Sequence, residues 1–489
     1  MNPRTTAILA VLALVLGAFV YFHEIGGEAE RKAAQENEER IHPGLDQDDV
    51  EAIELTTRDG IAARFERHDG SWALVSPVEG PADSVALDAM AHALTTLQRM
   101  GSVAEPGDLA QYGLDEGARI VRFEIGGTSR GLRIGGPTPV GGHTYVARLA
   151  DDDVGYVETY RINAFDRNLD DLRERRIFRF AEGDVRTLRV SWHEGDHEVE
   201  VALARDERGE WQMGAPLVTR ADQRTVHDLL SDLAFLRAKG FVDERTPAIE
   251  AALADPLLRI SWTLEGDHLE RSAKIAGPFE DALLVEAEDG RVFRIDVERR
   301  DDWKTRINDY RDKMLSEFDV SSARRIVLGF ADEDARSTRH LTAGLAESGW
   351  TSETPDVDPD RISELVREFA SLRAEDIVAD EMGPDELGSL GLAPPRVEVR
   401  IEGEAMEDGS RPLLANVEIG NAVEGRGLFA RRGDESTVYV LPQSMADRIP
   451  ISEEALMRQP ETPPAAEGDP GKGPSDGPGA DPLEGVEIP

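Results

Sequence analysis

Apolar side chains recur at helical spacing in three parts of the chain, each time shortly after a tryptophan, a proline and an aspartate. The tryptophans Trp72, Trp211 and Trp350 are separated by 139 residues in both intervals. Counted from the aspartate, the apolar residues stand at +4, +7, +11 and +14, which is one face of an α-helix. They are Leu87, Met90, Leu94 and Leu97; Val226, Leu229, Leu233 and Leu236; and Ile362, Leu365, Phe369 and Leu372. The pattern predicts three copies of one structural unit.

Before each helix, apolar and polar residues alternate, which is typical of strands. In the first copy we expect strands at 50–55, 63–65 and 72–75, joined by glycine-containing turns. Pro77 ends the third strand, because proline has no N–H for the sheet. Asp83, Asp222 and Asp358 are expected to cap the helices. The first half of each copy is therefore predicted to be a three-stranded meander, with a helix covering the tryptophan.

A second landmark repeats with the same spacing, since Leu114, Leu253 and Leu392 are again 139 residues apart. After Leu114, alternating segments at 120–125, 132–136, 144–148 and 154–158 predict a four-stranded antiparallel sheet. A charged helix is expected to close the first copy near Leu172 and the second near Tyr310, and a shortened one to close the third at 445–457. Each repeat is thus predicted to be α+β.

The N-terminal residues 5–22 carry no charge and read TTAILAVLALVLGAFVYF. Eighteen helical residues extend about 27 Å, which is just enough to cross a bilayer. We expect a retained single-pass anchor, although a cleaved signal peptide is the alternative. Arg4 precedes the segment and Glu24, Glu28 and Glu30 follow it, so the positive-inside rule places the N-terminus in the cytoplasm. The expected location is the bacterial inner membrane, with the body of the protein periplasmic.

The resulting division has six parts. Residues 1–25 are the predicted anchor, and residues 26–48 a polar stalk. The three repeats are expected at 49–181, 182–321 and 322–458. Residues 459–489 are rich in proline, glycine and acidic residues, and this composition predicts a disordered tail.

Composition narrows the possible partners. The 97 acidic and 55 basic residues give a formal net charge of −42, which disfavours binding to nucleic acid. The chain has no cysteine, so disulfides, thiol catalysis and thiolate metal sites are excluded.

Four stretches resemble functional motifs, and for each a structural explanation is favoured. His193 and His197, with their acidic neighbours, could ligate a metal, but the intervening Gly195-Asp196 is typical of a hairpin tip. The run 151–153 of three aspartates is interpreted as a hairpin turn in preference to a calcium site. The glycine-rich stretch 135–142 opens no helix, so it is not a dinucleotide fingerprint. The tail sequence 471–477 lacks the strand-turn-helix setting that a nucleophile or phosphate loop needs. We therefore predict no catalytic, cofactor-binding or metal-binding residues and no cofactor.

With the repeat established, the chain resembles the bacterial domain-of-unknown-function 4340 family over residues 49–455. The resemblance rests on the N-terminal apolar segment and on the pattern of strand, Trp, Pro, Ala-Asp and helix. Ala82-Asp83 and Ala221-Asp222 match this pattern, whereas Val357-Asp358 departs from it by one residue and a shorter loop. The resemblance implies a membrane-anchored extracytoplasmic protein, often a companion of ABC-type transport systems of the gliding or secretion kind. It supplies no catalytic residues.

Three functions from different classes are compatible with these observations. The favoured one is a non-enzymatic accessory or scaffold protein beside an ABC-type transporter, with a transporter permease as partner. The second is a module that binds cell-envelope polysaccharide, which an aromatic content of 6% disfavours. The third is a hydrolase whose site is hidden among the acidic residues. Tandem copies of one fold favour the first two, because repetition multiplies binding surfaces.

Overall fold

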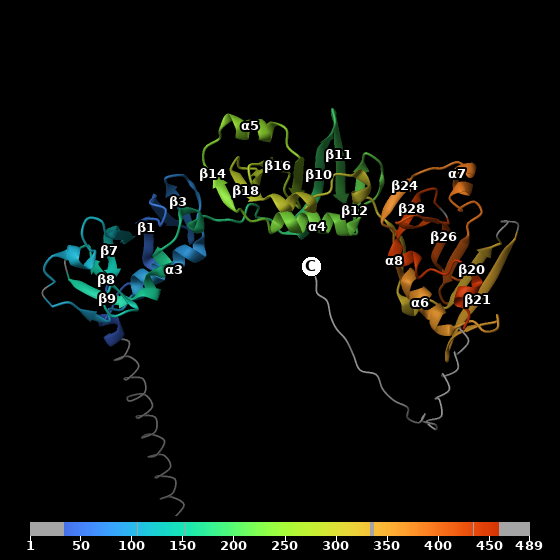
Figure 1. The fold of residues 1–489 in the computed structure, drawn as a ribbon, viewed down its shortest axis with the longest axis horizontal. Helices are drawn as coiled ribbons and strands as arrows, with labels where there is room; N and C mark the ends of the chain where they lie inside the picture. The colour runs from blue at the N-terminus through green and yellow to red at the C-terminus, as the bar shows by residue number, and fades with distance from the viewer. Residues whose placement is uncertain (1–33, 105, 152, 333–336, 434, 459–489) are drawn as a thin grey trace, which may run out of the picture. The chain divides into compact units, whose positions relative to one another are not determined.

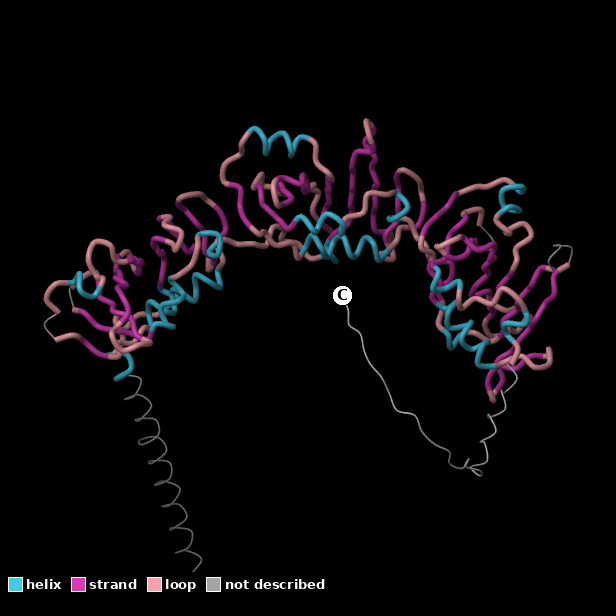
Figure 2. The backbone as a smooth tube through the Cα atoms, in the orientation of Figure 1, coloured by secondary structure: helices cyan, strands magenta, loops and turns pink. Residues whose placement is uncertain are grey.

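The computed structural model describes residues 34–104, 106–151, 153–332, 337–433 and 435–458. The chain divides into two compact units, Met1–Asp312 and Lys313–Pro489. Antiparallel sheets dominate both units, and short helices pack against them (Figures 1 and 2). Among the described residues, the first unit contains two sheets of nine strands each, and the second contains one sheet of eight strands and a two-stranded ribbon. The fold therefore consists of repeated sheet-rich domains.

The three large sheets share one strand order. The first runs β4-β3-β2-β1-β6-β7-β8-β9-β5, the second β13-β12-β11-β10-β15-β16-β17-β18-β14, and the third β22-β21-β20-β25-β26-β27-β28-β24. Strands of the first sheet are β1 Val50–Thr56, β2 Ala62–His68, β3 Ser71–Ser76, β4 Gly80–Pro81, β5 Gly101–Ser102, β6 Arg119–Ile125, β7 Thr128–Pro137, β8 His143–Arg148 and β9 Val154–Glu158. Strands of the second are β10 Val185–Glu194, β11 His197–Arg205, β12 Trp211–Ala215, β13 Thr219–Arg220, β14 Gly240–Val242, β15 Leu258–Leu264, β16 Arg271–Phe279, β17 Ala282–Glu286 and β18 Val292–Asp296. Strands of the third are β20 Arg325–Ala331, β21 Thr338–Ala346, β22 Gly349–Ser352, β24 Asp376–Ala379, β25 Val397–Glu402, β26 Leu413–Val423, β27 Gly427–Arg432 and β28 Val438–Pro442, and the ribbon pairs β19 Met314–Glu317 with β23 Ser371–Arg373.

The two halves predicted for each repeat join into a single sheet. Antiparallel pairing of β1 with β6 places Ile53 opposite Phe123, and the pairing of β10 with β15 places Val190 opposite Ile260. The third copy makes the same junction between β20 and β25. The sequence pattern predicts the strands but not this junction, because it does not show which edges meet. A free edge on the meander would leave N–H and C=O groups unpaired, and the junction satisfies them.

The predicted core helices are confirmed. They are α3 Ser84–Thr96, α4 Gln223–Ala234 and α6 Pro359–Ala370. In each helix, the aspartate expected as N-cap accepts a hydrogen bond from a backbone N–H of the first turn, at 2.8 to 3.0 Å. All twelve apolar residues of the three predicted helix faces are buried. Trp72, Trp211 and Trp350 lie in the same cores and are 2%, 3% and 9% exposed.

The remaining helices are short. They comprise α5 Pro247–Ala254, α7 Pro384–Ser389 and α8 Gln443–Ala446. The closing segments of the first two copies are single 3-10 turns, η5 Leu169–Leu172 and η8 Ile307–Tyr310, instead of the charged helices expected from the sequence. The other 3-10 turns are η2 Gln47–Asp49, η3 Leu109–Tyr112, η4 Thr159–Phe165, η6 Glu182–Asp184, η7 Val297–Asp302, η9 Val320–Ser322 and η10 Glu453–Leu456.

Each copy also begins with an incoming segment that pairs with the chain just after its helix. The N–H of Ile41 donates to the carbonyl of Leu97, and that of Ile177 donates to the carbonyl of Leu236. In the third copy, β19 pairs with β23 in the same place. Ile41 and His42 are buried within the predicted stalk, so the first folded repeat begins before residue 49.

The expectation of a transmembrane helix and of a single-pass inner-membrane location needs correction. Among the described residues, no helix is long and apolar enough to cross a membrane. The longest helix there, α3, has 13 residues, whereas a span needs about 20. The predicted anchor at 5–22 and the predicted disordered tail at 459–489 both lie outside the described residues.

Candidate functional site

The histidine pair singled out in the sequence lies at a hairpin tip, as predicted. β10 ends at Glu194, β11 begins at His197, and Gly195 adopts a positive φ of 63° in the turn between them. The Nδ1 atom of His193 lies 3.8 Å from a carboxylate oxygen of Asp255. Within the described part of the chain, no group of three or more His, Cys, Asp or Glu residues is arranged to hold a metal ion.

The other sequence motifs also occupy connections. Asp151 and Asp153 follow β8, where they form ion pairs with Arg148 at 2.7 Å and with Arg99 at 2.5 Å. The glycine-rich stretch 135–142 forms the end of β7 and the turn into β8. The tail motif at 471–477 lies outside the described residues. The absence of catalytic, cofactor-binding and metal-binding residues stays a prediction.

The second repeat carries an acidic hollow of about 360 Å³ between α4 and the segment that follows β18. Asp228 and Asp232 come from α4, and Asp301 and Asp302 come from the end of η7. Their positions follow from the helix pattern, because residues four apart on α4 share the face that is turned away from its core. Lys304 and the buried Tyr310 complete the lining.

Negative charge dominates this acidic hollow even after its internal ion pairs are counted. Arg299 lies 3.1 Å from Asp232 and 2.9 Å from Asp302. Burial raises the pKa of the Asp232 carboxyl, and the neighbouring carboxylates of Asp302 and Asp228 add to that increase, whereas Arg299 opposes it. Four carboxylates therefore face one another with too few cations, which favours the entry of a guanidinium or ammonium group.

A second hollow of the same repeat, of about 520 Å³, is lined by aromatic residues. Trp192 and Trp303 lie there beside His193 and Glu194. The Trp192 indole N–H donates to the Glu194 carboxylate at 3.2 Å, and its ring stacks on Tyr310. Trp192 and Trp303 are only 3% and 7% exposed, so neither presents an open face on which a sugar could stack.

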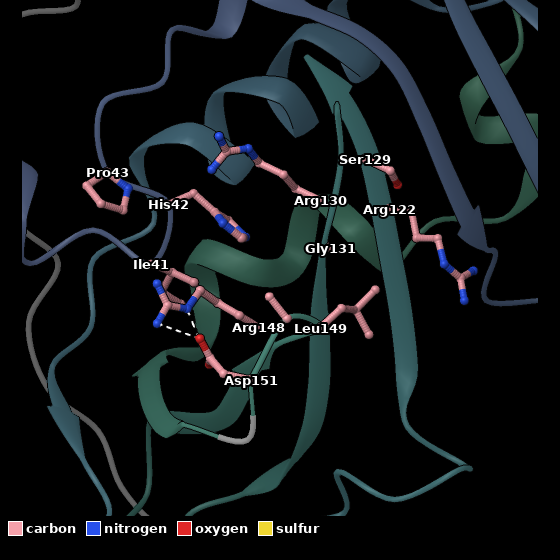
Figure 3. A pocket seen from close by; sticks show the side chains of 11 residues that line it. Ile41, His42, Pro43, Arg122, Ser129, Arg130, Gly131, Arg148, Leu149 and Asp151 are labelled. Atoms are coloured by element: carbon pink, nitrogen blue, oxygen red, sulfur yellow. Dashed lines mark hydrogen bonds and ion pairs between the residues drawn. The ribbon is translucent and has the colours of Figure 1, made fainter. Parts of the chain in front are cut away.

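The first repeat contains a hollow of opposite character, of about 340 Å³. Its lining includes the buried His42 and three arginines, Arg122, Arg130 and Arg148, with Asp151 as the one carboxylate. Arg130 and Arg148 lie on either side of the His42 imidazole, and Arg122 lies farther from it (Figure 3). The chain as a whole has a large excess of acidic residues, so this basic hollow runs against its average charge.

With this geometry established, comparison with known families is informative. A family model described as a domain of unknown function, DUF4340, matches residues 72–256, 282–386 and 352–463. These segments cover most of the chain. The protein belongs to the DUF4340 family. Searches of curated proteins and of solved structures returned no significant match.

Membership of DUF4340 confirms the resemblance seen in the sequence but assigns no activity. The three hollows escaped sequence reasoning for a physical reason. Each gathers residues far apart in the chain, such as His42 with Arg130 and Arg148, and no short motif records such an arrangement. The sequence did contain one sign of the basic hollow. His42 stands on the segment that enters the first repeat, where the second repeat has Phe178.

Proposed function

We propose that this DUF4340 protein is a non-enzymatic accessory or scaffold protein that works by binding other proteins, with an ABC-type transport system as its partner. The observation that supports this proposal is the threefold repetition of one sheet, each copy with a core helix packed on one of its faces. Repetition of a fold multiplies surfaces for contact more readily than it multiplies active sites.

The face of each sheet opposite the core helix carries ionised side chains. In the first sheet, Arg64 pairs with Glu124 at 3.1 Å across β2, β1 and β6. Lys274 pairs with Glu286 at 2.6 Å in the second sheet, and Arg431 pairs with Glu418 in the third. Such faces remain hydrated in the free protein and suit polar contacts with a partner.

Charge sets the chemistry of that partner. A protein with a net charge of −42 attracts basic surfaces, and the acidic hollow on the second repeat offers a place for an arginine or lysine side chain. Basic loops of a transporter permease have this chemistry. Association of this kind weakens with salt, because exposed charges are screened beyond about 8 Å at physiological ionic strength.

The proposal is tested by pull-down of the tagged full-length chain from detergent-solubilised membranes at low and high salt. We expect transporter subunits at low salt and a lower yield at high salt. Asp228→Asn with Asp301→Asn should reduce recovery. The matched control, Glu207→Gln with Glu347→Gln, removes the same charge from two exposed positions elsewhere and should retain it.

Three outcomes would contradict the proposal. Recovery that is independent of salt and of both double variants would exclude charge-driven contact. Recovery of polysaccharide alone would favour the alternative binding module. A purified chain that turns over a substrate, and loses this activity when one carboxylate is replaced, would show that the protein is an enzyme.

A further inference from the structure

The first two repeats differ sharply at one equivalent position. Ile41 and Ile177 make the same backbone hydrogen bond to the residue that follows the core helix, so His42 is the counterpart of Phe178. Each ring packs edge-on against the counterpart aromatic residue of the sheet, with centroids 5.1 Å apart for His42 and Phe123 and 5.4 Å apart for Phe178 and Trp262. A titratable imidazole therefore occupies a core position that an apolar ring fills in the next copy.

The residues around this position also differ, because the first repeat has a smaller or a basic residue where the second has an apolar one. Phe180, which also packs on Trp262, corresponds to Gly44, so the first repeat lacks a second ring and leaves space there. Arg148 lies opposite Leu132 on the neighbouring strand. In the second repeat Lys274 lies opposite Glu286, and by this register the next residue, Ala287, is the equivalent of Arg148. The second repeat is thus closed by apolar side chains, and the first is open and basic.

An arginine is common to both copies, but its partners are not. Arg130 lies opposite Phe123, as Arg271 lies opposite Trp262. Arg271 is neutralised by Asp267 at 2.8 Å and approached by Glu288 at 3.7 Å. The Arg130 guanidinium has no hydrogen-bond or ion-pair partner among the residues that the structure describes, although it acts electrostatically on His42.

His42 itself is poorly satisfied where it lies. It is 5% exposed, and its Nε2 atom is buried without a hydrogen-bond partner among the described residues. Burial, followed by the charges of Arg130 and Arg148, lowers the pKa of His42 to about 4, so the ring is neutral near pH 7. An unpaired buried polar atom costs about 1 to 3 kcal/mol, and a ligand that pairs with it recovers that free energy.

We propose that this basic hollow is a binding site for a small oxyanion of the phosphate class. Arg130 and Arg148 supply charged N–H donors, and neutral His42 supplies a further donor in the tautomer that carries its proton on Nε2. Guanidinium groups match the several oxygens of a phosphate better than they match a single acceptor. Arg148 pairs with Asp151 at 2.7 Å, so this pair is neutral and Arg130 supplies the positive charge that attracts the ligand.

The volume limits the ligand to a small molecule. A hollow of about 340 Å³ accommodates inorganic phosphate or a small phosphate monoester. The third repeat does not reproduce the site. Its arginine in the register of Arg148, Arg432, pairs with Glu435 at 2.5 Å and also donates to the carbonyl of Met314.

The test is calorimetric titration of the full-length chain with inorganic phosphate, glycerol phosphate and acetate in separate experiments. We expect phosphate or its monoester to bind and to raise the melting temperature, and acetate to bind more weakly. The two phosphate arms distinguish the free ion from an ester. Arg130→Gln should weaken binding about tenfold or more, because a charged donor is lost.

Two further variants keep the result interpretable. His42→Phe reproduces the second repeat, so it should fold stably and yet lose affinity for phosphate. Arg361→Gln removes a positive charge from an exposed position on α6 and should bind phosphate as the wild type does. The proposal is wrong if no phosphate compound binds at millimolar concentration, if Arg361→Gln weakens binding as much as Arg130→Gln, or if His42→Phe binds unchanged.

Discussion

The first and second repeats have the same sheet order and the same capped helix, yet they fill one corner of the fold in opposite ways. In the second repeat, Phe178 and Phe180 pack on Trp262, and the nearby arginine is paired with carboxylates. In the first repeat, His42 takes the place of Phe178 and Arg130 has no such partner among the described residues.

This difference separates residues that hold the fold from residues that are available for other purposes. The tryptophan, the N-cap aspartate and the apolar helix face recur in all three copies, because the sheet must be covered to exclude water from its core. The corner at His42 folds with either chemistry. A buried imidazole without a partner does not stabilise the fold by itself, and this observation supports the oxyanion site proposed above.

The largest effect is expected where the two repeats agree. Trp211→Ala should lower the free energy of unfolding by about 3 to 5 kcal/mol, because it removes a buried aromatic side chain from the second core. Urea denaturation followed by circular dichroism measures this loss. Glu207→Ala, an exposed change nearby, should stay within about 0.5 kcal/mol of the wild type. Equal stabilities for the two variants would show that Trp211 is not a core residue.

Giving the second repeat the histidine of the first should also lower the free energy of unfolding. Phe178→His places a polar ring against Trp262 and removes apolar contact, so we expect a loss of about 3 kcal/mol at pH 7. The same denaturation experiment measures it, with the exposed change Arg179→His beside it as control. An unchanged free energy of unfolding would mean that this corner tolerates a polar group without a ligand.

The pH dependence of stability isolates His42. Its pKa falls from 6.5 to about 4 in the folded chain because burial, then Arg130 and Arg148, disfavour the imidazolium. Between these pH values the unfolded chain binds a proton that the folded chain does not bind. The free energy of unfolding therefore decreases as pH falls through this window, by about 2 to 3 kcal/mol. The profile of His42→Phe should lack this contribution, so the difference between the wild-type and variant profiles measures it, and two parallel profiles would contradict the prediction.

The smallest effect is expected from the reverse exchange. His42→Phe should raise the free energy of unfolding at pH 7 by about 1 kcal/mol, because it removes an unpaired polar atom and adds contact with Phe123. Denaturation without phosphate in the buffer measures this gain, since a bound anion would stabilise only the wild type. A clear loss of stability would show that the His42 ring makes contacts that phenylalanine cannot replace.

Much of the fold could be predicted from the chain alone. Periodicity identifies the three helices, their caps and their buried faces, because these features depend on residues close together in sequence. The junction of β1 with β6 could not be found in this way, because strand pairing over such a distance leaves no local pattern. The closing segments near Leu172 and Tyr310 are single 3-10 turns, and their apolar spacing did not distinguish a turn from a helix.

The repeat, the buried face of each core helix and membership of the DUF4340 family follow from the amino-acid pattern alone. Which charged residues share a hollow depends on how the chain packs in three dimensions. Asp228 and Asp301 become neighbours because α4 packs beside the segment after β18, and Arg130 and Arg148 flank His42 because β7 and β8 pair beneath the incoming segment. Core positions are fixed by the short-range alternation of apolar and polar residues. A binding site depends on distances between residues that are far apart in the chain, and folding alone sets those distances.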